Sequence, residues 1–245
     1  MRRVFIILLL TAVGAAGTAA EDDGKALKAR ATLSYQGTGG NTRNHGGAAA
    51  GKVEYTRGRL ILDGHGDYAV TSTDGVKTGE NGGAGGGAKY FLTAAERLYG
   101  RYKGEWRRNV FAGFEHRASN FAGVGVYVIR AEAQELSAEV GPNYINEWYP
   151  EGGEKDSASF AAAHAGVDYR LLPGDRTELD AGVVWDMNLD DTEDQLLAAD
   201  VTLRISVADW LAFTATEKVA WDNVPSEGFE ELDLTTTVGL SLQNY

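Results

Sequence analysis

The chain has 245 residues and carries 35 acidic against 23 basic side chains, which gives a formal net charge of −12. An acidic surface repels phosphate backbones, so we expect no nucleic-acid partner. The chain has no cysteine, which excludes disulfides, zinc–thiolate sites and cysteine nucleophiles. It has 32 glycines but only 4 prolines, and scarce proline suits long hydrogen-bonded strands.

The first 20 residues have the features of a cleaved secretory signal peptide. Arg2 and Arg3 give a positive start, residues 4–13 are apolar, and residues 18–20 are small. The apolar run is shorter than the roughly 20 residues of a transmembrane helix. We therefore expect cleavage after Ala20 and a single exported domain over residues 21–245. An uncleaved anchor is the alternative.

Past residue 20 the dominant hydrophobic period is two. Around residue 200, for example, Val201 and Leu203 alternate with Asp200, Thr202 and Arg204. Such alternation predicts strands with one apolar and one polar face. The expected strands lie near residues 26–38, 45–57, 59–71, 83–92, 96–108, 117–131, 134–149, 157–172, 176–190, 193–207, 210–222 and 231–244.

The connections between these strands alternate in length. Short turns near residues 56–58, 93–95 and 131–134 are separated by longer polar loops such as residues 72–82 and 109–116. This alternation, with strands of about 9–11 residues or more, is typical of outer-membrane barrels. We therefore expect an all-β, transmembrane, antiparallel up-and-down β-barrel of about 12 strands in the cell outer membrane. A soluble sandwich or lipocalin-like barrel is the alternative, but small polar side chains would not fill an interior this wide.

Four segments carry a resemblance to a known family. Residues 33–35 (LSY) precede residues 40–42 (GNT), and these are followed by residues 109–117, 121–127 and 136–144. In this order they resemble motifs of the salt-induced outer-membrane proteins, the YdiY-like (DUF481-like) family. The resemblance implies an outer-membrane barrel without an established activity, and it assigns no catalytic or binding residue.

Two positions depart from the expected pattern. Asn109 stands where the family usually has an acidic residue. Tyr245 falls one position out of phase with Leu240 and Leu242, whereas outer-membrane proteins usually end on an in-phase aromatic residue. We expect the barrel-assembly machinery to be a partner during insertion, acting on an imperfect signal or through a bulge.

The sequence offers little support for catalysis. His116 and Ser119 are the nearest approach to a hydrolase pair, but no G-x-S-x-G elbow is present. We expect no enzymatic activity and no cofactor, with an outer-membrane acyl hydrolase as the disfavoured alternative. Glu115, His116 and Arg117 form a polar cluster beside a long loop. They are either a ligand site at the barrel mouth or, as we favour, an ion pair that pins the loop.

Two further patterns resemble binding motifs. Acidic residues crowd the loops near residues 186–194 and 222–231, but the calcium-loop spacing is absent, which favours a solvated acidic surface. Loop-bound divalent cations that bridge to lipid headgroups are the alternative. Glycines 82, 83 and 85–87 resemble a phosphate loop only superficially, since no G-K-[ST] follows. They are expected to let a strand bend.

The lumen is the nearest the sequence comes to a functional site. Strand parity places mainly basic residues inward in the first half of the chain and mainly acidic ones in the second. The candidates for the lumen and its mouth are Arg97, Arg101, Lys103, Glu115, Arg117, Asp180, Asp186, Asp200 and Arg204. If basic and acidic walls pair directly, long side chains fill the lumen.

These features predict a structural or stress-related barrel with an occluded or narrow polar lumen. A small-solute, porin-like diffusion channel and a soluble periplasmic binding barrel are the alternatives to be tested. The expected partners are outer-membrane lipid and lipopolysaccharide, and small polar solutes if the lumen conducts.

Overall fold

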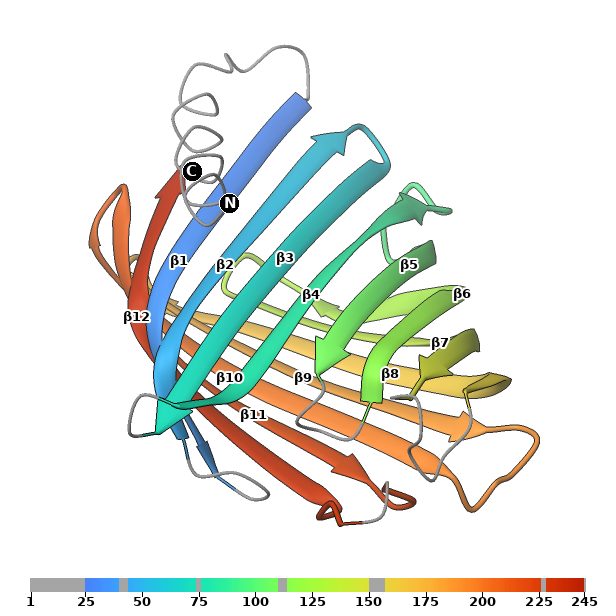
Figure 1. Cartoon of the computed structure of the whole chain (residues 1–245). Helices are drawn as coiled ribbons and strands as arrows, with labels where there is room; N and C mark the ends of the chain where they lie inside the picture. The colour runs from blue at the N-terminus through green and yellow to red at the C-terminus, as the bar shows by residue number, and fades with distance from the viewer. Residues whose placement is uncertain are drawn as a thin grey trace.

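The computed structural model describes residues 25–39, 44–73, 76–109, 114–149, 157–225 and 228–244. In this part of the chain, twelve antiparallel strands form one closed barrel (Figure 1). Among the described residues, no helix has the length and apolarity needed to cross a membrane. The expected signal peptide and Tyr245 lie outside the described residues.

The strand number and the fold class are those that the sequence predicts. The strands are β1 (Lys25–Gly39), β2 (Asn44–Arg57), β3 (Leu60–Thr73), β4 (Val76–Phe91), β5 (Leu98–Asn109), β6 (Phe114–Arg130), β7 (Gln134–Trp148), β8 (Ala158–Gly174), β9 (Thr177–Asn188), β10 (Gln195–Ala208), β11 (Leu211–Asp222) and β12 (Leu232–Asn244).

The largest boundary error concerns β4, which begins at Val76 although residues 72–82 were expected to be a loop. The polar and glycine-rich start of this strand looks like a loop in isolation. It is ordered as a strand because its backbone pairs with β3, as in the register Val70↔Glu80 and Tyr68↔Gly82. Tertiary pairing here overrides local propensity.

Each strand pairs with its neighbours in the chain, and β1 pairs with β12 to close the barrel. Leu33 of β1 lies opposite Leu240 of β12 on one side and Ala49 of β2 on the other. Closure leaves no unpaired strand edge. In Figure 1, β1–β4 form the wall nearest the viewer and β8–β11 lie behind it.

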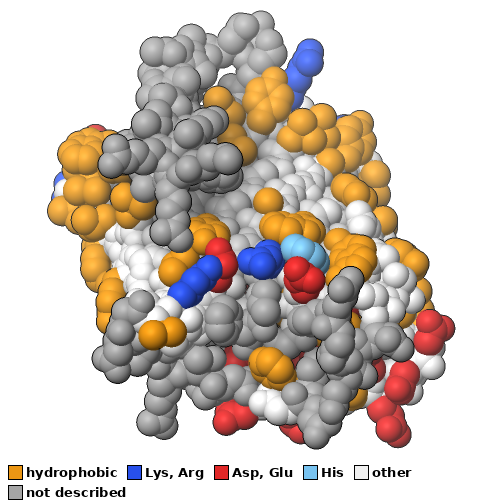
Figure 2. All heavy atoms as spheres, viewed as in Figure 1, with side chains coloured by type: hydrophobic (Ala, Val, Ile, Leu, Met, Phe, Trp, Pro, Cys, Tyr) orange, Lys and Arg blue, Asp and Glu red, His pale blue; other side chains and the backbone are white. Residues whose placement is uncertain are grey.

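The outer face of the barrel is apolar. Val183 is 46% exposed, and Leu62, Tyr68, Leu203 and Phe213 are also exposed outward, as their strand parity predicts. Trp185 lies in phase with Val183 on β9. Figure 2 shows hydrophobic side chains over the upper part and both sides of the face toward the viewer, with acidic side chains mostly in its lower half.

One outward position is charged. Glu217 lies midway along β11 and accepts a hydrogen bond of 2.6 Å from Thr236 Oγ1 of β12. A carboxylate on this face favours a bulge or a place outside the apolar band. There is no bulge at this position, because the register Glu217↔Thr236 is unbroken and the nearest irregularity in the pairing of β11 with β10 lies between Ser206 and Ala208.

Candidate functional site: the barrel lumen

Most of the sequence-predicted candidates line the lumen. Side chains of Arg101, Lys103, Arg117, Asp180, Asp186, Asp200 and Arg204 lie on the inward-facing parity of their strands. Arg97 does not. It is exposed in the turn between β4 and β5, because β5 starts at Leu98 rather than at residue 96.

The middle of the inward face of β4 consists of Gly83, Gly85 and Gly87, and side chains from both neighbouring strands meet above these glycines. Arg101 Nη1 of β5 lies 2.6 Å from Asp63 Oδ1 of β3. His65 Nε2 of β3 lies 3.1 Å from Glu105 of β5. A side chain at Gly85 would meet the Glu105 carboxylate at about 2.7 Å. The glycine run therefore makes room for ion pairs that bridge from β3 to β5.

A second polar network fills the lumen beside β5–β9. Lys103 of β5 forms an ion pair with Glu139 of β7, whose side chain is only 3% exposed. Asp186 Oδ1 of β9 lies 2.8 Å from His164 Nδ1 and accepts a 2.9 Å hydrogen bond from Asn143 Nδ2. Buried charges are retained only where they are paired, so this network is a packed interior.

Aromatic side chains fill the lumen near the turn between β4 and β5. Phe91, Tyr99 and Tyr127 form one buried cluster. Tyr99 lies across Gly125 of β6, where any side chain would collide with its ring. Lys89 Nζ lies 4.5 Å from the centre of the Tyr99 ring and donates a 2.9 Å hydrogen bond to Tyr127 Oη.

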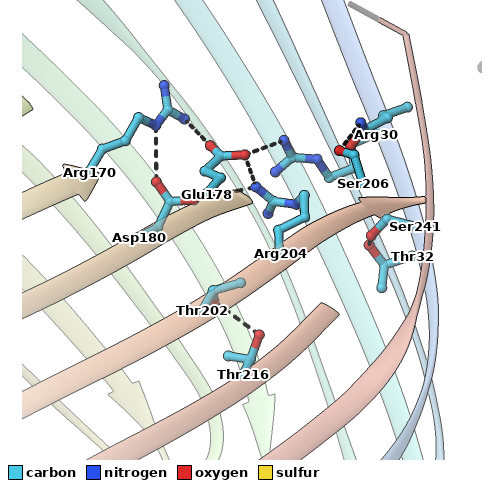
Figure 3. Close-up of polar contacts among 11 residues, drawn as sticks. Arg30, Thr32, Arg170, Glu178, Asp180, Thr202, Arg204, Ser206, Thr216 and Ser241 are labelled. Carbon is cyan, nitrogen blue, oxygen red and sulfur yellow. Dashed lines mark hydrogen bonds and ion pairs between the residues drawn. The ribbon is translucent and has the colours of Figure 1, made fainter. Parts of the chain in front are cut away.

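Arginines and carboxylates form a third network near the short turns of β8–β11 (Figure 3). Arg170 binds Glu178 and Asp180 at 3.0 Å each, and Arg204 contacts both carboxylates. Arg30 Nη2 of β1 lies 3.6 Å from Glu178 of β9. Because β10–β12 separate these two strands in the wall, this contact crosses the lumen. We call a contact between non-neighbouring strands across the lumen a chord.

A second chord lies at the long-loop end. Arg117 Nε of β6 lies 2.5 Å from Glu147 of β7, and Arg117 Nη2 lies 3.7 Å from Asp222 of β11, five strands away. Beside it is a cavity of about 220 Å³ lined by Glu147, Asp222, Asp194, Tyr149 and other residues. Burial and a 2.5 Å hydrogen bond to Glu147 raise the pKa of the Tyr149 phenol.

The expected cluster around residue 116 is divided between two faces. His116 points outward and stacks on Trp106 at 5.4 Å between ring centres, while Glu115 lies 3.8 Å from its Nε2. The partners of Arg117 are Glu147 and Asp222, not Glu115. Ser119 lies on the inward parity of β6, so His116 and Ser119 do not face each other as a hydrolase pair would.

The expected pairing of basic residues of the first half of the chain with acidic residues of the second is partly present. Among the described residues, the ion pairs Arg30–Glu178, Lys103–Glu139 and Arg117–Asp222 join the two halves. Arg101 instead pairs with Asp63, within the first half. Strand parity gave the correct face for these groups but could not identify their partners.

Part of the lumen is open to water. Four side chains that point inward by the alternation of their strands are nevertheless exposed, namely those of Lys52, Asp168, Asp200 and Lys218. Lys52, for instance, lies opposite Arg30 on one side and His65 on the other, both of which point inward. The space beside β10, β11 and β2 is therefore not filled by packed side chains.

The acidic loops do not assemble a metal site in the described residues, where no group of three or more His, Asp or Glu side chains has suitable geometry. Glu227, part of one of these groups, lies outside the described residues.

Fold and lumen together define an outer-membrane-type β-barrel. The solved structure of the NanC porin aligns over 89% of this chain and 99% of its own, with a TM-score of 0.58 and 9% identity. A "bacterial polysaccharide outer membrane secretin" aligns over 89% of this chain and 98% of its own, with a TM-score of 0.50 and 10% identity. These likenesses concern the fold.

The chain belongs to the family described as "Protein of unknown function, DUF481", whose model matches residues 31–243. It is also 23% identical over 176 residues to "Uncharacterized protein YdiY" of Escherichia coli (strain K12). That match covers 71% of this chain and 66% of the relative, slightly less than two thirds of its length. The family resemblance noted in the sequence is confirmed.

Proposed function

We propose that the protein is an outer-membrane barrel that forms a narrow channel for small polar solutes. The apolar outer face and the DUF481 membership support a membrane location, and the barrel neighbours support it at the level of the fold. A bilayer is the environment in which an apolar outside and a polar inside are both stable.

The observation that carries the channel is the water-exposed charge inside the barrel. Asp200 and Lys218 point into the lumen and remain exposed, whereas a solid interior would bury or pair them. The chords Arg30–Glu178 and Arg117–Asp222 narrow both ends. Together these features favour low conductance and exclusion of large solutes.

A second candidate rests on the packed half of the lumen. The Lys103–Glu139 and His164–Asp186 contacts and the aromatic cluster brace the wall from inside. A barrel braced in this way would suit a structural or stress-related envelope protein without transport. No catalytic role is proposed.

Purified, refolded protein in planar bilayers separates the two candidates. The channel predicts small, reproducible conductance steps in KCl, together with swelling of proteoliposomes in a small polar solute. A barrel that inserts, as shown by protease protection, but carries no current and no solute would favour the structural role.

A further inference from the structure

Several inward-facing glycines of β4 and β9 lie between side chains of the two neighbouring strands. On β4, each of three alternate glycines lies between a β3 and a β5 side chain that lean over it. Over Gly87 these are Asp63 and Arg101, and over Gly85 they are His65 and Glu105. The space above Gly87 is closed by the Arg101–Asp63 ion pair, and the space above Gly85 by the 3.1 Å contact between His65 and Glu105.

Gly182 of β9 has the same geometry with a different outcome. It pairs with Asp168 of β8 and Asp200 of β10, so the two carboxylates flank it on the lumen face. A side chain at Gly182 would lie 3.2 Å from Asp200 Oδ1 and 3.5 Å from Asp168 Oδ1. Both carboxylates therefore lean over the glycine, but they carry like charges and cannot pair.

These two carboxylates also remain without a close protein cation. Among the described residues, neither Asp168 nor Asp200 has an ion pair within 4 Å, and both are exposed to the lumen. The charges of Lys218, the β11 neighbour of Asp200, and of Lys52 on β2 act on Asp200 from a greater distance. Lys103 and Lys89 likewise interact electrostatically with Asp168.

Two carboxylates held side by side in a confined, partly aqueous space attract a mobile cation more strongly than either would alone. The surrounding lysines limit the net negative charge of this region. Their ammonium groups can also bind the anionic group of a zwitterionic solute. Such an arrangement selects solutes by charge, as charged side chains that line channels do.

We propose that Asp168 and Asp200 form a charge-selective site in the open part of the lumen, where the ammonium group of a small cationic or zwitterionic solute binds above Gly182. This inference rests on the proposed channel and specifies its solute class. The path for the solute runs past the exposed side chains of Lys52, Asp168, Asp200 and Lys218, beside the packed Lys103–Glu139 and His164–Asp186 contacts.

The test measures the reversal potential of the full-length barrel in a KCl gradient across planar bilayers, and compares Asp168→Asn/Asp200→Asn with the parent. We expect the double variant to lose several-fold in its preference for K⁺ over Cl⁻, and Lys52→Gln to change the preference in the opposite direction. Glu217→Gln is the matched control, since it removes a carboxylate at the same height of the wall from the outer face. It is expected to leave the ion preference unchanged.

Uptake of a zwitterion into proteoliposomes gives a second readout. Glycine betaine should enter faster through the parent than an anion of similar size, and Asp168→Asn/Asp200→Asn should remove that advantage. If the parent conducts but the double variant keeps both its K⁺ preference and its betaine uptake, the proposed charge-selective site is wrong while the channel stands. If the inserted parent carries no current, the channel itself is wrong.

Discussion

Arg101 and Asp63 form an ion pair of 2.6 Å across a strand to which neither belongs. Arg101 lies on β5 and Asp63 on β3, and the strand between them, β4, contributes Gly87 beneath the pair. A Cβ added at Gly87 would lie 3.2 Å from Arg101 Cζ. The bare glycine face of β4 is thus a requirement of the lumen network. It explains a composition that, in the sequence, looks like a loop or a phosphate-binding turn.

The first prediction concerns that glycine face. Gly85→Val should destabilise the barrel by about 1–3 kcal/mol, because the new side chain displaces the Glu105 carboxylate from His65. Gly100→Val is the control, since nothing lies within 4 Å of a side chain there. It should change stability by less than about 0.5 kcal/mol. Urea unfolding in lipid vesicles measures both, and equal costs would contradict the bridging role.

The second prediction concerns the two faces of the wall. Val183→Arg places a charge on the outer face and should cost about 2–4 kcal/mol if that face meets lipid near the bilayer centre. Thr202→Arg should cost less, because Thr202 faces the lumen, where it forms a 2.9 Å hydrogen bond with Thr216 (Figure 3). A refolding titration of both variants tests this, and a greater cost at Thr202 would reverse the assignment of inside and outside.

The third prediction concerns the chord at the long-loop end. Asp222→Asn removes one charge from the chord but leaves Arg117 paired with Glu147. Conductance should therefore rise with little change in thermal stability. Single-channel recording in KCl measures the change. Conductance at or below the parental value would show that this contact does not limit the mouth.

The fourth prediction concerns pH. Because burial and the Glu147 hydrogen bond raise the pKa of Tyr149 in the folded state above its ordinary value of 10.0, the unfolded chain releases this proton first. The stabilising contribution of Tyr149 is complete below about pH 10 and is lost as the pH rises towards the folded-state pKa. The late part of the phenolate absorbance titration should lose one tyrosine in Tyr149→Phe. An unchanged titration curve in that variant would contradict the environment described here.

The sequence predicts the barrel well because its signal is repetitive. Alternation at positions such as Val201, Thr202 and Leu203 recurs in most strands, so an error at one boundary does not alter the strand count. The exceptions arise where local composition and tertiary pairing disagree. The polar start of β4 is a strand only because β3 lies beside it, and Arg97 is outside the wall because β5 begins at Leu98, two residues later than expected.

The lumen is less predictable, since parity gives a face but not a neighbour. Lys103 was identified as an inward residue, but its partner Glu139 was not, because the two are separated by all of β6. Asp168 and Gly182 were likewise missed as site residues. Their signal was present: an inward glycine between two inward acidic residues on adjacent strands can be found once the register is known.

Thiol labelling measures most directly whether one side of the lumen is open and the other packed. The natural chain has no cysteine, so Asp200→Cys and Lys103→Cys each provide a single reactive site. In refolded barrels in vesicles, a small charged methanethiosulfonate reagent should label Asp200→Cys rapidly and Lys103→Cys slowly or not at all, as read from intact mass. Equal labelling of both positions, or protection of Asp200→Cys, would contradict the account.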